Sequence, residues 1–197
     1  MTRVLLASRN AKKLAELRRI LAPVSGLDII GLDAVPPFPE APETGATFEE
    51  NALAKARDAV VATGLPTIAE DSGLSVDALN GMPGVLSARW SGKHGDDQTN
   101  LELVLAQLTD VPDARRGAAF VAAAALVTPT GTETVVRGTW PGTITRKARG
   151  TNGFGYDPIF IPEGETRTSA ELDPSEKDAN SHRGRALRLL VPHLATL

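Results

Sequence analysis

The sequence predicts an α/β fold in which a mixed β-sheet is flanked by helices. Short apolar runs alternate with helical patterns in the first half of the chain, an order typical of parallel strands joined by helices. A hairpin pattern follows in the second half and adds antiparallel strands. With 197 residues, of which 42% are hydrophobic, the chain can bury a sizeable core, so we expect a single domain over residues 1–197.

The first expected elements are a short strand and a helix joined by a polar turn. Residues 3–7 form a largely apolar run that is too short for a helix, and they lead directly into the polar residues 8–10. A helical pattern follows, with Leu14, Leu17 and Leu21 on one face.

The next helix has clear signals at both ends. Thr47 and Glu50 form a capping-box pattern, and Gly64 is expected to end the helix. Residues 32–45, which precede it, are rich in proline and acidic side chains, and we interpret them as an ordered loop within the domain. The apolar stripe of this helix consists of Phe48, Ala52, Ala56 and Ala59.

A strand that starts after Pro66 leads into two carboxylates. We expect residues 67–69 to form the strand and Ser72-Gly73 to form part of a turn. Glu70 and Asp71 would then lie at the end of the strand, beside that turn.

The second half is expected to hold two helices and a hairpin. Residues 120–128 are ambiguous, because their alanines favour a helix but their valines and the turn at 129–131 favour a hairpin with residues 133–137. We interpret them as an antiparallel hairpin. The last helix should begin near Ser181, and Pro192 should kink or end it. The apolar sides of the two helices are Leu101, Val104, Leu105 and Leu108, and Leu187, Leu190 and Leu194.

Composition excludes several classes of function. The chain has no cysteine, which excludes disulfides, thiolate metal sites and a cysteine nucleophile, and only three histidines, which argues against a zinc site. Its net charge of −3 provides no global field for a nucleic-acid backbone. No apolar run is long enough to span a membrane or to act as a signal peptide. We expect a cytoplasmic protein that binds neither nucleic acid nor membrane.

A first polar cluster could bind phosphate. Ser8, Asn10 and Lys13 lie where a turn enters a helix, and the free N–H groups and dipole of a helix start favour an anion. The alternative, which is favoured when this motif is taken alone, is a simple N-cap by Ser8 or Asn10 with a solvated Lys13.

A second cluster could bind a metal ion. Glu70 and Asp71, joined by Glu43 or Glu40 from the acidic loop, offer the hard oxygen ligands that suit Mg²⁺. A bound cation would also relieve the repulsion between adjacent acids. The alternative is that the two carboxylates only solvate a turn or cap the next segment.

Two further clusters could recognise a base. Phe154 and Tyr156 are two of only six Phe and Tyr residues, and they lie in the glycine-rich loop 153–158, where they could stack on a purine or pyrimidine. The alternative is a tight turn whose rings cap the core. Near the last helix, Lys177, Ser181 and Arg183 would supply donors that favour keto bases over adenine. His182, taken alone, is more often a packed or solvated residue.

The sequence resembles the inosine/xanthosine triphosphate pyrophosphatase family in six blocks that occur in family order over nearly the whole chain. The resemblance implies an elongated mixed sheet flanked by helices, two lobes with the active-site cleft between them, and a homodimer. It also implies Mg²⁺-dependent hydrolysis of noncanonical purine nucleoside triphosphates to monophosphate and pyrophosphate, which cleanses the nucleotide pool. The blocks are Ser8-x-Asn10-x-x-Lys13, Glu43-Thr44-Gly45-x-Thr47-Phe48-x-Glu50-Asn51-Ala52, Glu70-Asp71-Ser72-Gly73-Leu74, Pro83-Gly84-Val85-x-Ser87-Ala88-Arg89, Gly153-Phe154-Gly155-Tyr156-Asp157-Pro158 and Ser181-His182-Arg183-Gly184.

Carried over by position, the resemblance implies roles for individual residues. The catalytic, metal-associated carboxylate is Asp71, with Ser72 beside it. Glu43 and Glu70 are further candidate metal ligands, although many bacterial members have two aspartates at 70–71 and an acid where this chain has Pro42. Triphosphate contacts are implied at Ser8, Asn10 and Lys13, and base and sugar contacts at Phe154, Gly155, Tyr156, Asp157, Lys177, His182 and Arg183.

Two other functions remain open from the sequence. A related nucleotide pyrophosphatase that acts on pyrimidine or modified nucleotides should lack the Ser-His-Arg block at residues 181–183. A non-enzymatic nucleotide sensor would have little use for Glu70 and Asp71. A kinase-like transferase is disfavoured, because the chain has no Walker or kinase glycine-rich loop.

Overall fold

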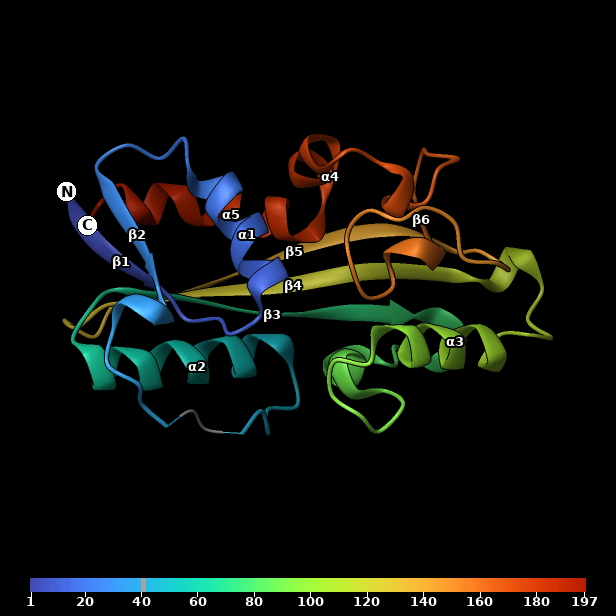
Figure 1. The fold of residues 1–197 in the computed structure, drawn as a ribbon, viewed down its shortest axis with the longest axis horizontal. Coiled ribbons are helices and arrows are strands. Elements are labelled where there is room, and N and C mark those ends of the chain that lie inside the picture. Colours follow the sequence, from blue (N-terminus) through green and yellow to red (C-terminus); the bar gives the residue numbers. More distant parts are fainter. Residues whose placement is uncertain (40–41) are drawn as a thin grey trace. The chain divides into compact units, whose positions relative to one another are not determined.

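The structure is a computed structural model that describes residues 1–39 and 42–197, and it contains one mixed sheet (Figure 1). The six strands are ordered β2-β1-β3-β4-β5-β6. The strands are β1 (Thr2–Leu6), β2 (Leu27–Gly31), β3 (Thr67–Val76), β4 (Gly117–Val127), β5 (Glu133–Ile144) and β6 (Phe160–Pro162). The α-helices are α1 (Ala11–Leu21), α2 (Phe48–Thr63), α3 (Asp97–Gln107), α4 (Pro174–Asn180) and α5 (His182–Leu194).

Strand pairing confirms the mixed sheet. β1 runs parallel to both neighbours, with Leu6 opposite Gly31 of β2 and Ile68 of β3. β5 and β6 are antiparallel, and Ile144 lies opposite Phe160. The chain therefore combines helix-connected parallel strands with a hairpin, as the sequence pattern predicts.

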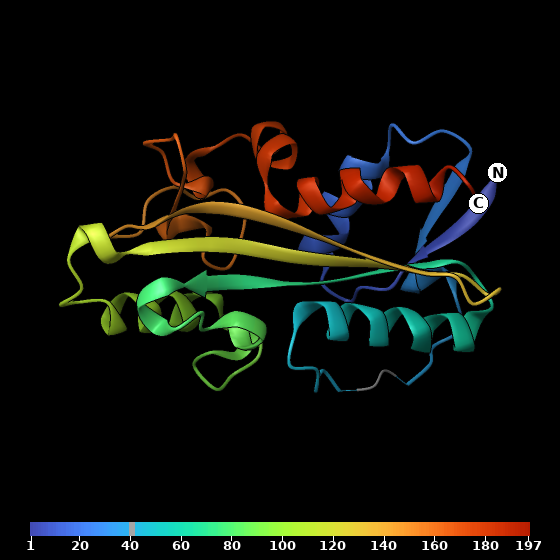
Figure 2. The ribbon, with the colours of Figure 1, turned by 180° about the vertical axis from the view of Figure 1, so that it is seen from behind.

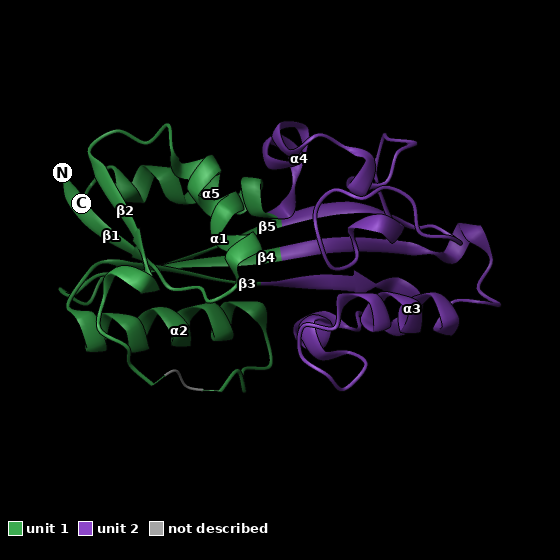
Figure 3. Cartoon of the chain, in the orientation of Figure 1, with its two compact units in different colours: residues 1–71, 122–138, 183–197 green, residues 72–121, 139–182 purple. Residues whose placement is uncertain are grey.

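The chain divides into two compact units, coloured separately in Figure 3. Unit 1 comprises residues 1–71, 122–138 and 183–197, and unit 2 comprises residues 72–121 and 139–182. Both chain termini belong to unit 1 and lie close together (Figure 2). The Thr2 hydroxyl donates a hydrogen bond to the Leu197 carbonyl at 3.4 Å.

The core of unit 1 contains the apolar faces that the sequence predicts for its helices. Leu17 and Leu21 of α1 pack in one buried cluster with Leu187, Leu190 and Leu194 of α5 and with residues of β1, β3 and β4. In unit 1, α2 covers the opposite face of the sheet from α1 and α5 (Figures 1 and 2). The predicted stripe of α2 is buried at Phe48, Ala52, Ala56 and Ala59.

The signals at the ends of α2 are confirmed with one change. The Thr47 hydroxyl accepts a hydrogen bond from the Glu50 amide at 3.1 Å, and Gly64 ends the helix in the left-handed conformation, at φ 67°. The Glu50 carboxylate accepts from the Ala46 amide at 2.7 Å. The reciprocal half of the capping box is thus made one residue earlier than the pattern implies.

The core of unit 2 is built around aromatic residues and one buried guanidinium. Phe120, Trp140 and Phe160 pack with the predicted Leu101 and Val104 of α3 and with Leu108, which caps that helix. Arg116 is buried and donates to the main-chain carbonyls of Leu108, Ile144 and Thr145 at 2.6 to 2.9 Å and to that of Val111 at 3.5 Å. It therefore ties the end of α3 to the end of β5.

Two expectations about β3 are wrong. The strand does not end at a turn after Asp71 but continues to Val76, so Glu70 and Asp71 lie inside it. Gly73 is needed for close packing, since a Cβ there would lie 2.3 Å from the Ser87 hydroxyl and 2.5 Å from the Gly84 carbonyl oxygen. The same hydroxyl accepts from the Leu74 amide at 2.9 Å.

The remaining expectations concern the second half of the chain. The hairpin is confirmed, because β4 and β5 are neighbours joined by a short turn in which the Thr128 amide donates to the Thr132 carbonyl. The alanines of β4 suit a strand that is buried along nearly its whole length. Pro192 does not end α5, which continues to Leu194. Within the described residues, no helix combines the length and apolarity needed to cross a membrane.

Candidate active site

The neighbouring carboxylates Glu70 and Asp71 point to opposite faces of the sheet, because successive side chains alternate along a strand. Glu70 contacts residues of α1 and α5, whereas Asp71 contacts residues of α2 on the other face (Figure 1). The expectation that the two acids repel each other beside a turn and share one cation therefore does not fit their geometry.

Glu70 belongs to a buried chain of alternating charges. Its Oε2 lies 3.1 Å from Lys13 Nζ, and its Oε1 accepts from Arg183 Nε at 3.1 Å. The other end of the Arg183 guanidinium donates to Glu16 of α1 through a short contact. Burial opposes the charge of Arg183, but Glu70 and Glu16 outweigh it and hold the pKa of Arg183 above its ordinary value. Arg183 thus joins α5 to α1 and β3 inside unit 1.

Asp71 is held by two residues of α2. The Asn51 side-chain amide donates to Oδ2 at 3.0 Å, and Lys55 Nζ lies 3.5 Å from Oδ1. Burial raises the pKa of Asp71, and Glu43 raises it further, although Lys55, Lys13 and the Asn51 hydrogen bond act in the opposite direction. A carboxylate with a raised pKa is a stronger proton acceptor than an exposed aspartate.

Lys55 connects Asp71 to the acidic loop. Its Nζ donates to Glu43 Oε1 at 2.6 Å and to the Glu70 carbonyl at 3.3 Å. Burial lowers the pKa of Lys55, but attraction from Asp71 and Glu43 exceeds that effect, so the pKa lies above its ordinary value. The ammonium group is therefore charged at neutral pH.

A cavity of about 180 Å³ opens beside this pair. It lies between the polar face of α2 and the loop that precedes it. Its lining consists of Pro42, Glu43, Thr44, Gly45, Glu50, Asn51, Ala54, Lys55 and Asp58.

The donor set is small for a metal site. Across residues 1–39 and 42–197, no group of three or more His, Asp or Glu side chains is arranged to hold a metal ion. Glu43 and Asp71 are nevertheless brought together through Lys55. Glu40, the other candidate from the acidic loop, lies outside the described residues.

The residues of the predicted phosphate cluster already have partners within the protein. Asn10 Oδ1 accepts from the amides of Lys12 and Lys13 at 3.0 and 3.1 Å, which confirms the N-cap interpretation for Asn10. The Ser8 hydroxyl accepts from the Asn10 amide at 3.3 Å. The expectation of a solvated Lys13 is wrong, because its side chain is only 17% exposed and pairs with Glu70.

In unit 2, Asp157 organises the aromatic loop. Its Oδ2 accepts from the Phe154 amide at 2.8 Å and from Lys177 Nζ at 2.6 Å, while Oδ1 accepts from the Ser169 hydroxyl at 2.8 Å. Lys177 Nζ lies 5.2 Å from the centre of the Phe154 ring. The loop reverses at Gly153, with φ 75°, where a Cβ would meet Asp157 Oδ2 at 2.0 Å.

The two aromatic residues of this loop differ in their surroundings. Phe154 is partly exposed, whereas Tyr156 is buried in the core of unit 2 and its hydroxyl donates to the Ser87 carbonyl at 2.8 Å. The alternative interpretation, a ring that caps the core, therefore holds for Tyr156. His182 is also buried and stacks on Phe120 with a centroid distance of 4.8 Å, in line with a packed histidine.

The remaining predicted residues lie at the boundaries of the units or in the loop. Ser72 follows Asp71 in β3 and is the first residue of unit 2, and His182 is followed by Arg183 of unit 1. The Gly155 amide donates to Asp97 of α3 at 3.1 Å.

Sequence reasoning gave no role to four of these residues. They are Glu16, Asn51, Lys55 and Asp97. A signal existed for Asn51 and Lys55, because they lie four residues apart on one face of α2, beside an alanine stripe that must be buried. Glu16 lies three residues after Lys13 on α1, which is a weaker signal of the same kind.

Comparisons with known proteins agree on one family. A model of the Ham1 family matches residues 4–193. The dITP/XTP pyrophosphatase of Nocardia farcinica is 73% identical over 199 residues, which cover 100% of this chain and 97% of that protein. The crystal structure of the nucleoside-triphosphatase / dITP/XTP pyrophosphatase from Mycobacterium abscessus is 64% identical, with a TM-score of 0.80 over 98% of this chain and 100% of that one. A HAM1 protein from Coxiella burnetii is 44% identical, with a TM-score of 0.88 over 100% of both chains.

Proposed function

Because the chain belongs to the Ham1 family, we propose that it hydrolyses the noncanonical purine nucleoside triphosphates of inosine, deoxyinosine and xanthosine to monophosphate and pyrophosphate. Relatives at up to 73% identity over the full chain are dITP/XTP pyrophosphatases. The observation that carries the assignment is the cluster of Asp71, Lys55 and Glu43, with Lys13 on Glu70 across the strand. This activity removes deaminated purines from the nucleotide pool.

The lysines neutralise phosphate charge. Lys13 and Lys55 are both less than one-fifth exposed, so each ammonium acts in a region of reduced dielectric, where its attraction for a phosphate is stronger than in water. The start of α1, with Ser8 and Asn10, adds the partial positive charge of a helix N-terminus. These groups stabilise the charge that moves onto pyrophosphate as the bond between the α- and β-phosphates breaks.

Asp71 is the proposed catalytic carboxylate. Asn51 donates to its Oδ2, and its Oδ1, which lies 3.5 Å from Lys55 Nζ, is the oxygen that we assign to accept the proton of the attacking water. The raised pKa of Asp71 makes it a stronger base than an exposed aspartate. Asn51 is therefore a positioning residue that orients the carboxylate.

We propose Mg²⁺ as the metal, bound by Asp71 and Glu43. Both side chains are hard oxygen donors, and the Lys55 ammonium already pairs with both of them. Mg²⁺ commonly takes one or two protein carboxylates together with substrate phosphates. Mg²⁺ bound there would offset negative charge on the phosphates. Glu70 is less suited to this role, because Lys13 and Arg183 occupy its two oxygens.

We propose that unit 2 supplies the contacts to the purine base of the nucleotide. Phe154 provides a partly exposed ring, and Lys177, held by Asp157, provides a donor for a keto oxygen. Gly155, Ser72 and His182 stay candidate contacts to base and sugar. Among the residues predicted to contact the nucleotide base, Arg183 is the least suited, because its guanidinium pairs with Glu16 and Glu70. We further propose a cytoplasmic homodimer, as the family resemblance implies.

Product analysis tests the function. Purified protein is incubated with inosine triphosphate or adenosine triphosphate, with and without Mg²⁺, and pyrophosphate and orthophosphate are assayed separately. We expect pyrophosphate and monophosphate from the inosine substrate alone, and only with Mg²⁺. Orthophosphate as the product would contradict the proposal, and no product from either substrate would favour a related pyrophosphatase or a nucleotide sensor. Size-exclusion chromatography with light scattering tests the dimer.

A further inference from the structure

We propose that Lys55 is a resident counter-cation of the metal site, which holds Glu43 and Asp71 together until nucleotide phosphates draw it away. Divalent metal would then bind tightly only when nucleotide is present. The inference rests on the proposed function, because it takes these two carboxylates as the metal ligands.

The ammonium group of Lys55 lies where a cation that bridges the two carboxylates would lie. Nζ is 2.6 Å from Glu43 Oε1, 3.5 Å from Asp71 Oδ1 and 3.3 Å from the Glu70 carbonyl oxygen. Three oxygen acceptors match the three N–H donors of an ammonium group. Lysine thus occupies an all-oxygen environment of the kind that a hard divalent cation prefers.

This arrangement disfavours a metal ion that arrives alone. The side chains of Lys55 and Asp71 are 18% and 7% exposed, so solvent screens the repulsion between the ammonium and an incoming cation only weakly. The two carboxylates together carry two negative charges, and Lys55 cancels one of them. A free divalent ion must therefore displace the ammonium without offering it a new anionic partner.

A bound nucleotide makes it easier for the metal to displace the Lys55 ammonium. Its phosphates give the Lys55 ammonium another anionic partner, and they add oxygen ligands to a site whose described residues supply no third carboxylate. The cavity of about 180 Å³ that Lys55 lines together with Glu43 and Asn51 provides room for the side chain to move. Metal and nucleotide affinities are then coupled, and the coupling is reciprocal.

The test is a Mn²⁺ titration followed by electron paramagnetic resonance, with and without a non-hydrolysable imido analogue of inosine triphosphate. We expect the wild type to bind Mn²⁺ at least tenfold more tightly with the analogue than without it. Lys55→Met, which keeps an unbranched side chain one atom shorter and removes the charge, should bind Mn²⁺ at least tenfold more tightly than the wild type when no nucleotide is present. Lys55→Gln serves as a second neutral variant in case the first does not fold.

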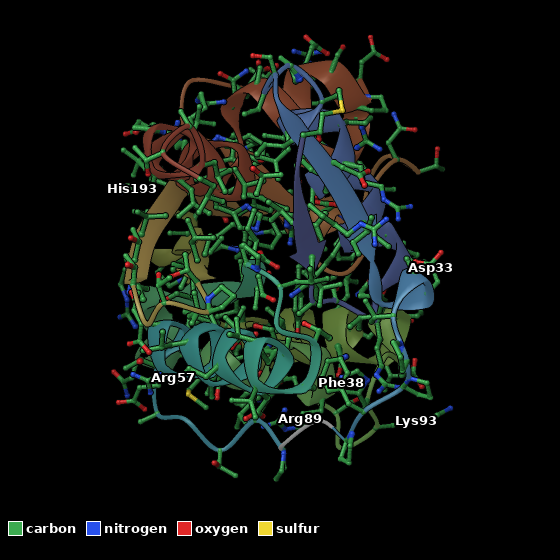
Figure 4. The ribbon with its side chains drawn as sticks, turned by 90° about the vertical axis from the view of Figure 1, so that its left-hand side faces the viewer. Asp33, Phe38, Arg57, Arg89, Lys93 and His193 are labelled. Carbon is green, nitrogen blue, oxygen red and sulfur yellow. The ribbon has the colours of Figure 1, made fainter. Side chains whose placement is uncertain are left out.

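Three control variants locate the effect. Lys55→Arg retains the charge and should remain as weak as the wild type without nucleotide. Lys93→Met removes one positive charge from an exposed residue of unit 2, which projects outward in Figure 4, and should leave Mn²⁺ affinity unchanged. Asp71→Asn in the Lys55→Met background should abolish the gain.

Unchanged or weaker Mn²⁺ binding by folded Lys55→Met and Lys55→Gln would overturn the inference, because lysine would then pre-organise the carboxylates without competing for them. A gain that survives Asp71→Asn would overturn it as well. The proposed function is judged separately by pyrophosphate release from inosine triphosphate by the wild type. An active wild type without the expected shift in the neutral variants leaves that function intact and removes only the role of Lys55.

Discussion

The two units use buried charge in different ways. In unit 1, side chains of opposite sign pair mainly with one another, and single groups have two partners: Glu70 holds Lys13 and Arg183, and Lys55 holds Glu43 and Asp71. In unit 2, the Asp157 carboxylate pairs with the Lys177 ammonium and accepts further hydrogen bonds from the Phe154 amide and the Ser169 hydroxyl. Shared side-chain partners can be exchanged for a ligand, whereas bonds to the main chain fix a loop. From this difference we expect changes in unit 1 to affect phosphate chemistry and changes in unit 2 to affect base selection.

The largest effect is expected from Asp71, the proposed catalytic carboxylate of unit 1. Asp71→Asn should lower kcat/KM for inosine triphosphate by about a thousandfold or more, because an amide neither accepts the proton nor binds the metal well. Pyrophosphate release measures this loss, and circular dichroism checks the fold. A folded Asp71→Asn protein within tenfold of wild-type activity would refute the assignment.

The second prediction compares the buried cations. Arg183→Met should destabilise the protein by about 3 to 5 kcal/mol, since it leaves Glu16 and Glu70 buried without their shared partner. Lys177→Met should cost less, because Asp157 keeps two neutral donors. Guanidinium unfolding of both variants provides the measurement. Equal losses would show that the two networks do not differ in the way described.

The third prediction tests base selection in unit 2. Asp157→Asn should reduce the preference for inosine over adenosine triphosphate by about tenfold or more, because it weakens charge-assisted bonds that position Lys177 and the aromatic loop. The ratio of the two kcat/KM values measures selection. A matched Asn51→Ala variant in unit 1 should lower both values together and leave their ratio unchanged.

The fourth prediction separates the two rings of the aromatic loop. Tyr156→Phe removes only the hydrogen bond to Ser87, so it should cost about 1 kcal/mol of stability and leave the KM for inosine triphosphate unchanged. Phe154→Leu should raise that KM several-fold with little loss of stability, because this ring is partly exposed. The opposite pattern would assign stacking to Tyr156.

The smallest effect is expected at the surface of unit 1. Arg57, labelled on α2 in Figure 4, pairs with Glu133 through two hydrogen bonds of 2.7 Å, and this pairing lowers the pKa of Glu133. Arg57→Met should lower Tm by less than about 2 °C at pH 7. Because the folded-state pKa is depressed, the contribution exists above the ordinary pKa of glutamate and disappears as the pH falls through the folded value. The difference in Tm should therefore vanish in acid.

Local signals in the sequence predicted much of the fold. Helix starts at Asn10 and Thr47, the stop at Gly64 and the apolar stripes depend on neighbours within a few residues, so the pattern determines them. The end of β3 was not predicted from the sequence. Gly73 looks like a turn residue, but a side chain at this position would clash with Ser87, which lies outside its local sequence neighbourhood. Rules based on neighbouring residues do not include such contacts.

The candidate site was predicted as a set of residues but not as a set of partners. Asp71, Lys13 and Lys177 followed from motifs, whereas their pairing with Asn51, Glu70 and Asp157 depends on how elements pack. The burial of Tyr156 could not be predicted for the same reason, since the scarcity of aromatic residues and a loop position do not reveal whether a ring is covered. Residues that act through another side chain, such as Glu16, leave little trace in sequence.

The split composition of unit 1 sets an order of assembly during synthesis. Its core joins β1, near the start of the chain, to Leu187, Leu190 and Leu194 of α5, near the end, whereas unit 2 is complete at residue 182. The second unit therefore has its whole sequence available first, and the N-terminal strands must wait for the last helix before their apolar surface is covered. A chain that ends before α5 lacks Leu187, Leu190 and Leu194, so the apolar side chains of β1 that pack with them stay exposed, and such surface favours aggregation.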